Sequence, residues 1–175
     1  GEGMRITDID GKTYLDAVSG GVWTVNVGYG RKEIVDAVAK QMMEMCYFAN
    51  GIGNVPTIKF SEKLISKMPG MSRVYLSNSG SEANEKAFKI VRQIGQLKHG
   101  GKKTGILYRA RDYHGTTIGT LSACGQFERK VQYGPFAPGF YEFPDCDVYR
   151  SKFGDCADLG VKMAKQLEEV ILTVG

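Results

Sequence analysis

The segment "LSNSGSEANEKAFKIVRQIG", residues 76–95, joins a small polar turn to an amphipathic helix. Ser79 precedes Glu82 by three residues, which is the spacing of a capping box at a helix N-terminus. The run "RVYLS", residues 73–77, predicts a short strand just before that turn. Cations followed by glycines at residues 98–101 predict the end of the helix. A strand that leads directly into a helix favours an α/β architecture.

The turn Ser79-Gly80-Ser81 has two interpretations. Capping alone accounts for Ser79, and many helices begin in this way without binding a ligand. A helix N-terminus also attracts anions, Gly80 leaves the backbone open to one, and Ser81 adds a hydroxyl. Glu82 and Glu85 count against an anion unless their carboxylates are directed elsewhere. The turn therefore predicts a phosphate cup at the carboxyl edge of a parallel sheet.

A second polar segment follows another predicted strand. "TGILYR", residues 104–109, reads as a strand, and "RDYHG", residues 111–115, comes directly after it. Tyr113 and His114 should then lie at the same sheet edge as the cup, where an aromatic ring can stack on a planar ligand. Alone, this segment is most simply an ordinary surface loop. Beside a phosphate cup, it favours a small, flat, phosphorylated ligand.

The rest of the chain predicts an N-terminal segment and the first part of a larger sheet domain. We place the boundary near residue 55, which gives 1–55 and 56–175. The expected elements are a hairpin around Asp10-Gly11, a helix over 31–46, a helix starting at Pro56, a short helix within 115–125, a loop over 134–147 and a helix over 158–175. Two parallel strands make an unfinished sheet, so we expect the chain to be the front part of something larger.

Composition narrows the function classes. The 175 residues are 42% apolar and 24% charged with a net charge of +4, as in an ordinary soluble globular chain. The cations form no basic stripe and no apolar run approaches membrane length, so we expect neither nucleic-acid nor membrane binding. Four scattered cysteines and two histidines predict no metal site and indicate reduced thiols in the cytoplasm.

The glycine-rich stretches do not match the common nucleotide motifs. Gly28-Tyr29-Gly30 and Gly51-Ile52-Gly53 each begin a dinucleotide fingerprint, but Glu33 and Pro56 stand where its last glycine should be. A P-loop lysine is missing after Gly100. A bound phosphate should therefore belong to neither NAD nor ATP.

Five segments together resemble one family. They are "DIDGKTYLDAVSG" at 8–20, "NVGYGRKEIVDAVAKQ" at 26–41, "NSGSEANEKAFKIVR" at 78–92, "YHGTT" at 113–117 and "GPFAPG" at 134–139. In this order and spacing, they are similar to the class III pyridoxal-phosphate-dependent aminotransferases, the ω-transaminase group. The resemblance spans essentially the whole chain. It implies the type I fold of pyridoxal-phosphate-dependent transferases, which is α/β, with pyridoxal 5'-phosphate as the cofactor.

The resemblance also implies roles for residues of this sequence. Gly80 and Ser81, with Ser79 beside them, would contact the cofactor phosphate. Tyr113 would stack on the pyridine ring, and His114 would shape the loop behind it. Another residue, Trp23, would line the substrate pocket, although a core tryptophan is the alternative interpretation.

The implied activity moves an amino group from a terminal amine, with taurine as the expected donor, to a keto acid. Pyruvate is the expected acceptor and alanine its product. The resemblance also implies a homodimer with the site at the subunit interface. Its cofactor-binding lysine and ring-nitrogen aspartate are expected beyond Gly175, so no catalytic residue is assigned and residues 1–175 alone should be inactive. The alternatives are another reaction on the same cofactor, by an aminomutase or decarboxylase, and a non-catalytic phosphate-binding fragment.

Overall fold

The computed structural model describes residues 1–49 and 51–174. Contacts within the chain divide it into two compact units, Gly1–Val74 and Tyr75–Gly175. The domain boundary predicted near residue 55 stays a prediction. A division by contacts within these residues does not define the domains of the protein.

The first unit begins with the predicted hairpin. Strands β1 (Arg5–Thr7) and β2 (Thr13–Leu15) pair antiparallel, in a register that sets Ile6 opposite Tyr14. Asp8 closes the turn, because its Oδ1 accepts hydrogen bonds from the backbone N–H groups of Asp10, at 3.1 Å, and Lys12, at 2.9 Å. The turn at Asp10-Gly11 is confirmed, and the short side chain of Asp8 stabilises it locally.

Two helices follow a glycine-rich turn, η1 (Ser19–Trp23). They are α1 (Lys32–Met45) and α2 (Val55–Ile65), and both confirm the helices expected there. At the start of α2, the side chain of Asn54 accepts from Thr57 N–H at 3.0 Å, and Pro56 occupies the first turn, where its missing N–H costs nothing.

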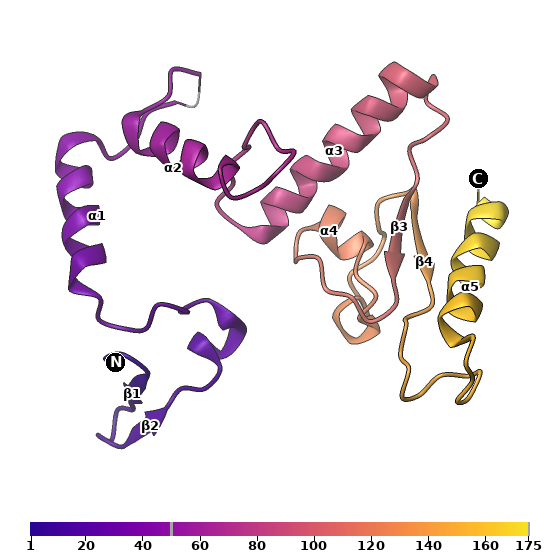
Figure 1. The fold of residues 1–175 in the computed structure, drawn as a ribbon, viewed down its shortest axis with the longest axis horizontal. Helices are drawn as coiled ribbons and strands as arrows, with labels where there is room; N and C mark the ends of the chain where they lie inside the picture. The colour runs from indigo at the N-terminus through magenta and orange to yellow at the C-terminus, as the bar shows by residue number, and fades with distance from the viewer. Residues whose placement is uncertain (50, 175) are drawn as a thin grey trace. The chain divides into compact units, whose positions relative to one another are not determined.

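The second unit contains a parallel strand pair with helices around it (Figure 1). Strands β3 (Ile106–Arg109) and β4 (Phe140–Phe143) lie side by side, with Ile106 opposite Phe140. Helix α5 (Leu159–Val174) contacts β4, and α3 (Gly80–His99) contacts the short α4 (Ile118–Ser122). A single 3₁₀ turn, η2 (Phe127–Arg129), follows α4. Gly100 ends α3 in the left-handed conformation, as its sequence predicts.

Two predictions about strands are wrong. Residues 73–77 form no hydrogen-bonded strand within the described chain, and the stretch predicted as a loop over 134–147 contains β4. A strand exists only where a second segment supplies the ladder of hydrogen bonds, and the partner of β3 is Phe140–Phe143. The four residues of β4 stand between Gly139 and Pro144, and a pattern this short does not predict a strand.

The packed core of the second unit lies around α4. Thr120 and Cys124 are fully buried, and Leu121 and Ala123 are buried beside them. Thr120 Oγ1 donates to the backbone oxygen of Thr117 at 3.1 Å, so this polar side chain enters the core with its hydrogen bond made. Of the helices that the structure describes, none has the length and apolar content that would let it cross a bilayer.

Candidate functional site

The N-terminus of α3 is capped as the sequence predicts, with one difference. Ser79 Oγ accepts from the backbone N–H of Glu82 at 3.2 Å, which confirms half of the capping box. The carboxylate of Glu82 accepts from Asn78 N–H at 2.8 Å, one residue before the expected partner. Within the described residues, nothing accepts from the N–H groups of Gly80 and Ser81. Two donors therefore remain available at the positive end of the helix.

Open space lies over Gly80. A Cβ built on this residue would meet no atom within 4 Å, and Gly80 does not need positive φ. The protein's own packing therefore does not require glycine here. An approaching ligand would require it, because any side chain would stand between the ligand and the free N–H groups.

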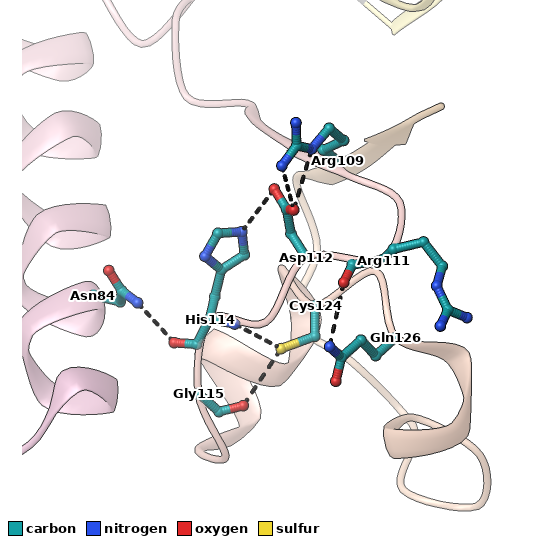
Figure 2. A network of polar contacts seen from close by, with 8 residues as sticks. All are labelled: Asn84, Arg109, Arg111, Asp112, His114, Gly115, Cys124 and Gln126. Atoms are coloured by element: carbon teal, nitrogen blue, oxygen red, sulfur yellow. Dashed lines mark hydrogen bonds and ion pairs between the residues drawn. The ribbon is translucent and has the colours of Figure 1, made fainter. Parts of the chain in front are cut away.

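Side chains from two other segments hold the loop after β3 at His114 and Gly115 (Figure 2). Asn84 Nδ2 donates to the backbone oxygen of His114 at 2.7 Å. Cys124 Sγ accepts from His114 N–H at 3.2 Å and donates to the backbone oxygen of Gly115 at 3.4 Å. The main chain at His114 is thus fixed from α3 on one side and from the buried thiol on the other.

Two more hydrogen bonds join α3 to the same loop. Ser81 Oγ accepts from the backbone N–H of Thr116 at 3.0 Å. Thr117 Oγ1 donates to Glu85 Oε1 at 2.5 Å. Glu82 and Glu85, which count against an anion site in the sequence, therefore bind Asn78 and Thr117, residues that do not line the cavity described below. The acidic residues leave the helix N-terminus free for an anion.

Gly115 allows the loop to lie this close to Ser81 and Thr120. A Cβ at this position would lie 2.5 Å from Ser81 Oγ and 2.5 Å from Thr120 Oγ1, and φ is +140°. Both the contact distances and the backbone conformation exclude other residues without rearrangement.

A cavity of about 380 Å³ opens between α3 and the loop. It is lined by Ser79, Gly80, Ser81, Asn84, Tyr113, His114 and Gly115. The structure thus brings together the five residues predicted to bind the cofactor, which come from segments 30 or more positions apart. Their individual roles stay predictions.

The ring of Tyr113 is half exposed and borders two cavities. The second, of about 430 Å³, also contains Arg129, whose guanidinium carbon lies 4.9 Å from the Tyr113 ring centroid. Arg129 does not line the cavity beside the cup. A cation–π contact of this kind restrains the ring beside the cup.

Asp112 organises charge at the base of the loop. It accepts two hydrogen bonds from Arg109, at 2.8 and 3.1 Å, and its other oxygen lies 4.0 Å from His114 Nε2 (Figure 2). Asp112 raises the pKa of the Arg109 guanidinium above its ordinary value, because hydrogen bonding and charge favour the protonated form. The His114 ring points toward Asp112 (Figure 2).

The residues at the cup fit a phosphate group. Two backbone N–H groups and a hydroxyl face open space at a helix N-terminus, which is the usual donor set for phosphate. Because Ser81 Oγ accepts from Thr116 N–H, its own hydrogen is left to donate elsewhere. Within the described chain, no cluster of three His, Cys, Asp or Glu side chains is arranged to hold a metal ion.

Trp23 belongs to the first unit, where it is 76% exposed with φ at +61°. Within the described chain it is therefore not part of a core. Its role in a substrate pocket stays a prediction.

Sequence reasoning missed Asn84, Cys124 and Arg129. Asn84 carried a usable signal, because it stands one helical turn after the cup on the same helix. Cys124 and Arg129 carried none, since only the folding of the loop brings them to Tyr113 and His114.

Residues 1–173 match the family described as "Aminotransferase class-III". This chain belongs to the class III aminotransferases. The family uses pyridoxal phosphate and has the type I transferase fold, so both the predicted fold class and the predicted cofactor are confirmed. The fit of the cup to a phosphate agrees with that cofactor.

Two curated relatives are similar over the whole chain. The taurine–pyruvate aminotransferase of Rhodobacter capsulatus is 56% identical over 175 residues, and the hypotaurine/taurine–pyruvate aminotransferase of Paracoccus denitrificans is 57% identical over 175 residues. In each case the match covers 100% of this chain and 38% of the relative. The chain thus spans well under half the length of these relatives.

Solved structures show the same fold. An amine transaminase from an uncultivated Pseudomonas species, in its PLP-bound form, superposes with a TM-score of 0.92 at 32% identity, over 100% of this chain and 40% of its own. The ω-transaminase of Pseudomonas jessenii, in complex with PMP, gives a TM-score of 0.94 at 28% identity, again over 100% and 40%.

Proposed function

We propose that this chain supplies the phosphate cup and the ring platform for pyridoxal phosphate in an aminotransferase. One observation carries the proposal: a single cavity is lined both by the open N-terminus of α3 and by Tyr113. The expected donor is taurine or a similar terminal amine, and the expected acceptor is pyruvate. The names of the relatives at 56% and 57% identity support these substrates.

Different residues of the chain bind different parts of the cofactor. Gly80 and Ser81 donate N–H groups to the phosphate, and Ser81 adds its hydroxyl. Tyr113 presents a flat ring that orients the pyridine ring and excludes water from one of its faces. When bound, pyridoxal phosphate supplies a carbonyl that carries the amino group between substrates and a ring that withdraws electrons. Positioning of this kind contributes much of the rate in group transfer.

The same proposal includes a cytoplasmic homodimer with the site at the subunit interface, and a cofactor-binding lysine outside these residues. It rests on the family resemblance. An aminomutase or a decarboxylase would use the same cup, so the products distinguish them. In the protein expressed from the complete gene, taurine and pyruvate should give alanine. Release of carbon dioxide, or an isomerised amine without alanine, would contradict the transfer reaction.

Two substitutions test the cup in that protein. Ser81→Ala removes a hydrogen bond to a charged group, worth about 1.5–3 kcal/mol, so cofactor affinity should fall by about 10- to 150-fold. Gly80→Val should lower the cofactor affinity further, because the valine side chain fills the open space above the N–H groups. Titration of apoenzyme with the cofactor measures both, with the exposed-site variant Lys89→Ala as the control. Unchanged affinity in both variants would remove the assignment.

A further inference from the structure

The loop that carries Tyr113 receives its geometry from α3, the same helix that forms the phosphate cup. The backbone oxygen of His114, the residue next to Tyr113, accepts from Asn84 Nδ2 at 2.7 Å across 30 residues of sequence (Figure 2). A carbonyl oxygen only accepts hydrogen bonds, so the amide nitrogen of Asn84 must face it. Asn84 stands one turn beyond Gly80 and lines the cavity.

The position of the Tyr113 ring relative to the cup therefore depends on a short series of bonded residues. It runs from Gly80 along one turn of α3 to the Asn84 amide, across one hydrogen bond to His114, and back one residue to Tyr113. The remaining contacts of α3 with the loop reach it further along, at Thr116 and Thr117. Cys124 holds His114 from the other side, from the segment after α4.

We propose that Asn84 is a positioning residue for the cofactor ring: its amide fixes the distance between the Tyr113 platform and the phosphate cup. This inference rests on the proposed function. A ligand that combines a phosphate with a flat ring must meet both surfaces at once, so an error in their spacing weakens its binding. A ligand with a phosphate and no ring uses the cup alone and is indifferent to the spacing.

Asn84→Ala removes the tether with little risk to folding, because the position is partly exposed and alanine favours helix. The matched control is Gln93→Ala, which deletes an exposed amide from the same helix. In the protein expressed from the complete gene, pyridoxal phosphate should bind about 3- to 10-fold more weakly to Asn84→Ala, the factor for one hydrogen bond. Inorganic phosphate, measured by calorimetry on the apoenzyme, should bind to both variants as to the wild type.

A double-mutant cycle supplies the second measurement. If Asn84 acts through Tyr113, the loss caused by Asn84→Ala should vanish when Tyr113→Ala is already present. The circular dichroism of the bound cofactor should also change in Asn84→Ala and stay unchanged in Gln93→Ala, because it reports the orientation of the ring.

Three outcomes would overturn the proposal. They are equal cofactor affinity in Asn84→Ala and Gln93→Ala, additive losses in the cycle with Tyr113→Ala, and weakened binding of inorganic phosphate, which would make Asn84 a direct phosphate ligand. Failure of the proposed function looks different, since the wild-type protein itself would then not bind pyridoxal phosphate.

Discussion

The two units of the chain carry similar apolar patterns and pack them very differently. Among residues 1–49 and 51–74, no side chain is buried, and the apolar stripe of α1 leaves Val38 51% and Met42 62% exposed. The second unit holds all the buried residues of the described chain, most of them in and around α4 and the others in α3, β3 and α5.

The difference shows that an amphipathic stripe and a core are separate properties. Helix α1 has the stripe that its spacing predicts, but no described segment of its unit covers it. The buried cluster contains Thr120, Ser122 and Cys124, and their polar atoms are bonded to nearby main chain. In the second unit, Cys124 therefore serves both the packing of the core and the anchoring of the loop after β3.

The largest expected effect compares one side chain from each unit. Leu121→Ala should lower the free energy of unfolding by about 2–5 kcal/mol, because it empties a buried position. Met43→Ala should change it by about 0.5 kcal/mol or less, as an exposed substitution does. Urea unfolding of the protein expressed from the complete gene measures both. A large cost at Met43 would show that a segment outside these residues covers α1.

A pair of glycines tests close packing inside the second unit. A Cβ on Gly95, within α3, would lie 2.1 Å from the backbone oxygen of Lys103, whereas one on Gly160, within α5, would meet nothing within 4 Å. Gly95→Ala should therefore destabilise by about 1–3 kcal/mol through overpacking. Gly160→Ala should stabilise by about 0.5–1 kcal/mol through helix propensity. Equal shifts in the two thermal midpoints would contradict the contact at Lys103.

The smallest expected effect concerns the glycine-rich turn of the first unit. Tyr29 Oη donates to Asp16 at 2.6 Å, and this bond, with the N–H groups of Gly20 and Val18, lowers the Asp16 pKa below 3.8. A lowered folded-state pKa contributes stability above the unfolded value, and the contribution is lost as pH falls through the folded pKa. Asp16→Asn should thus lower the thermal midpoint slightly at neutral pH. A difference in thermal midpoint between Asp16→Asn and the wild type that stays constant below about pH 4 would contradict this linkage.

The sequence by itself determined the local elements of this protein. The cap at Ser79, the left-handed glycine at Gly100 and the hairpin turn at Asp10-Gly11 all depend on contacts within a few residues. The five matching segments also determined the family and, with it, the cofactor. Such signals are readable because hydrogen bonds of caps and turns join near neighbours in the chain.

Tertiary structure alone decided which segment pairs with β3, and that segment is Phe140–Phe143. It also brought the Asn84 amide to the backbone oxygen of His114 and buried Cys124 beneath the loop. These contacts join residues between 9 and 34 positions apart, and their partners are chosen by how the chain closes on itself. No local pattern encodes that choice, because a strand or a loop gains its hydrogen bonds only after a distant segment has arrived.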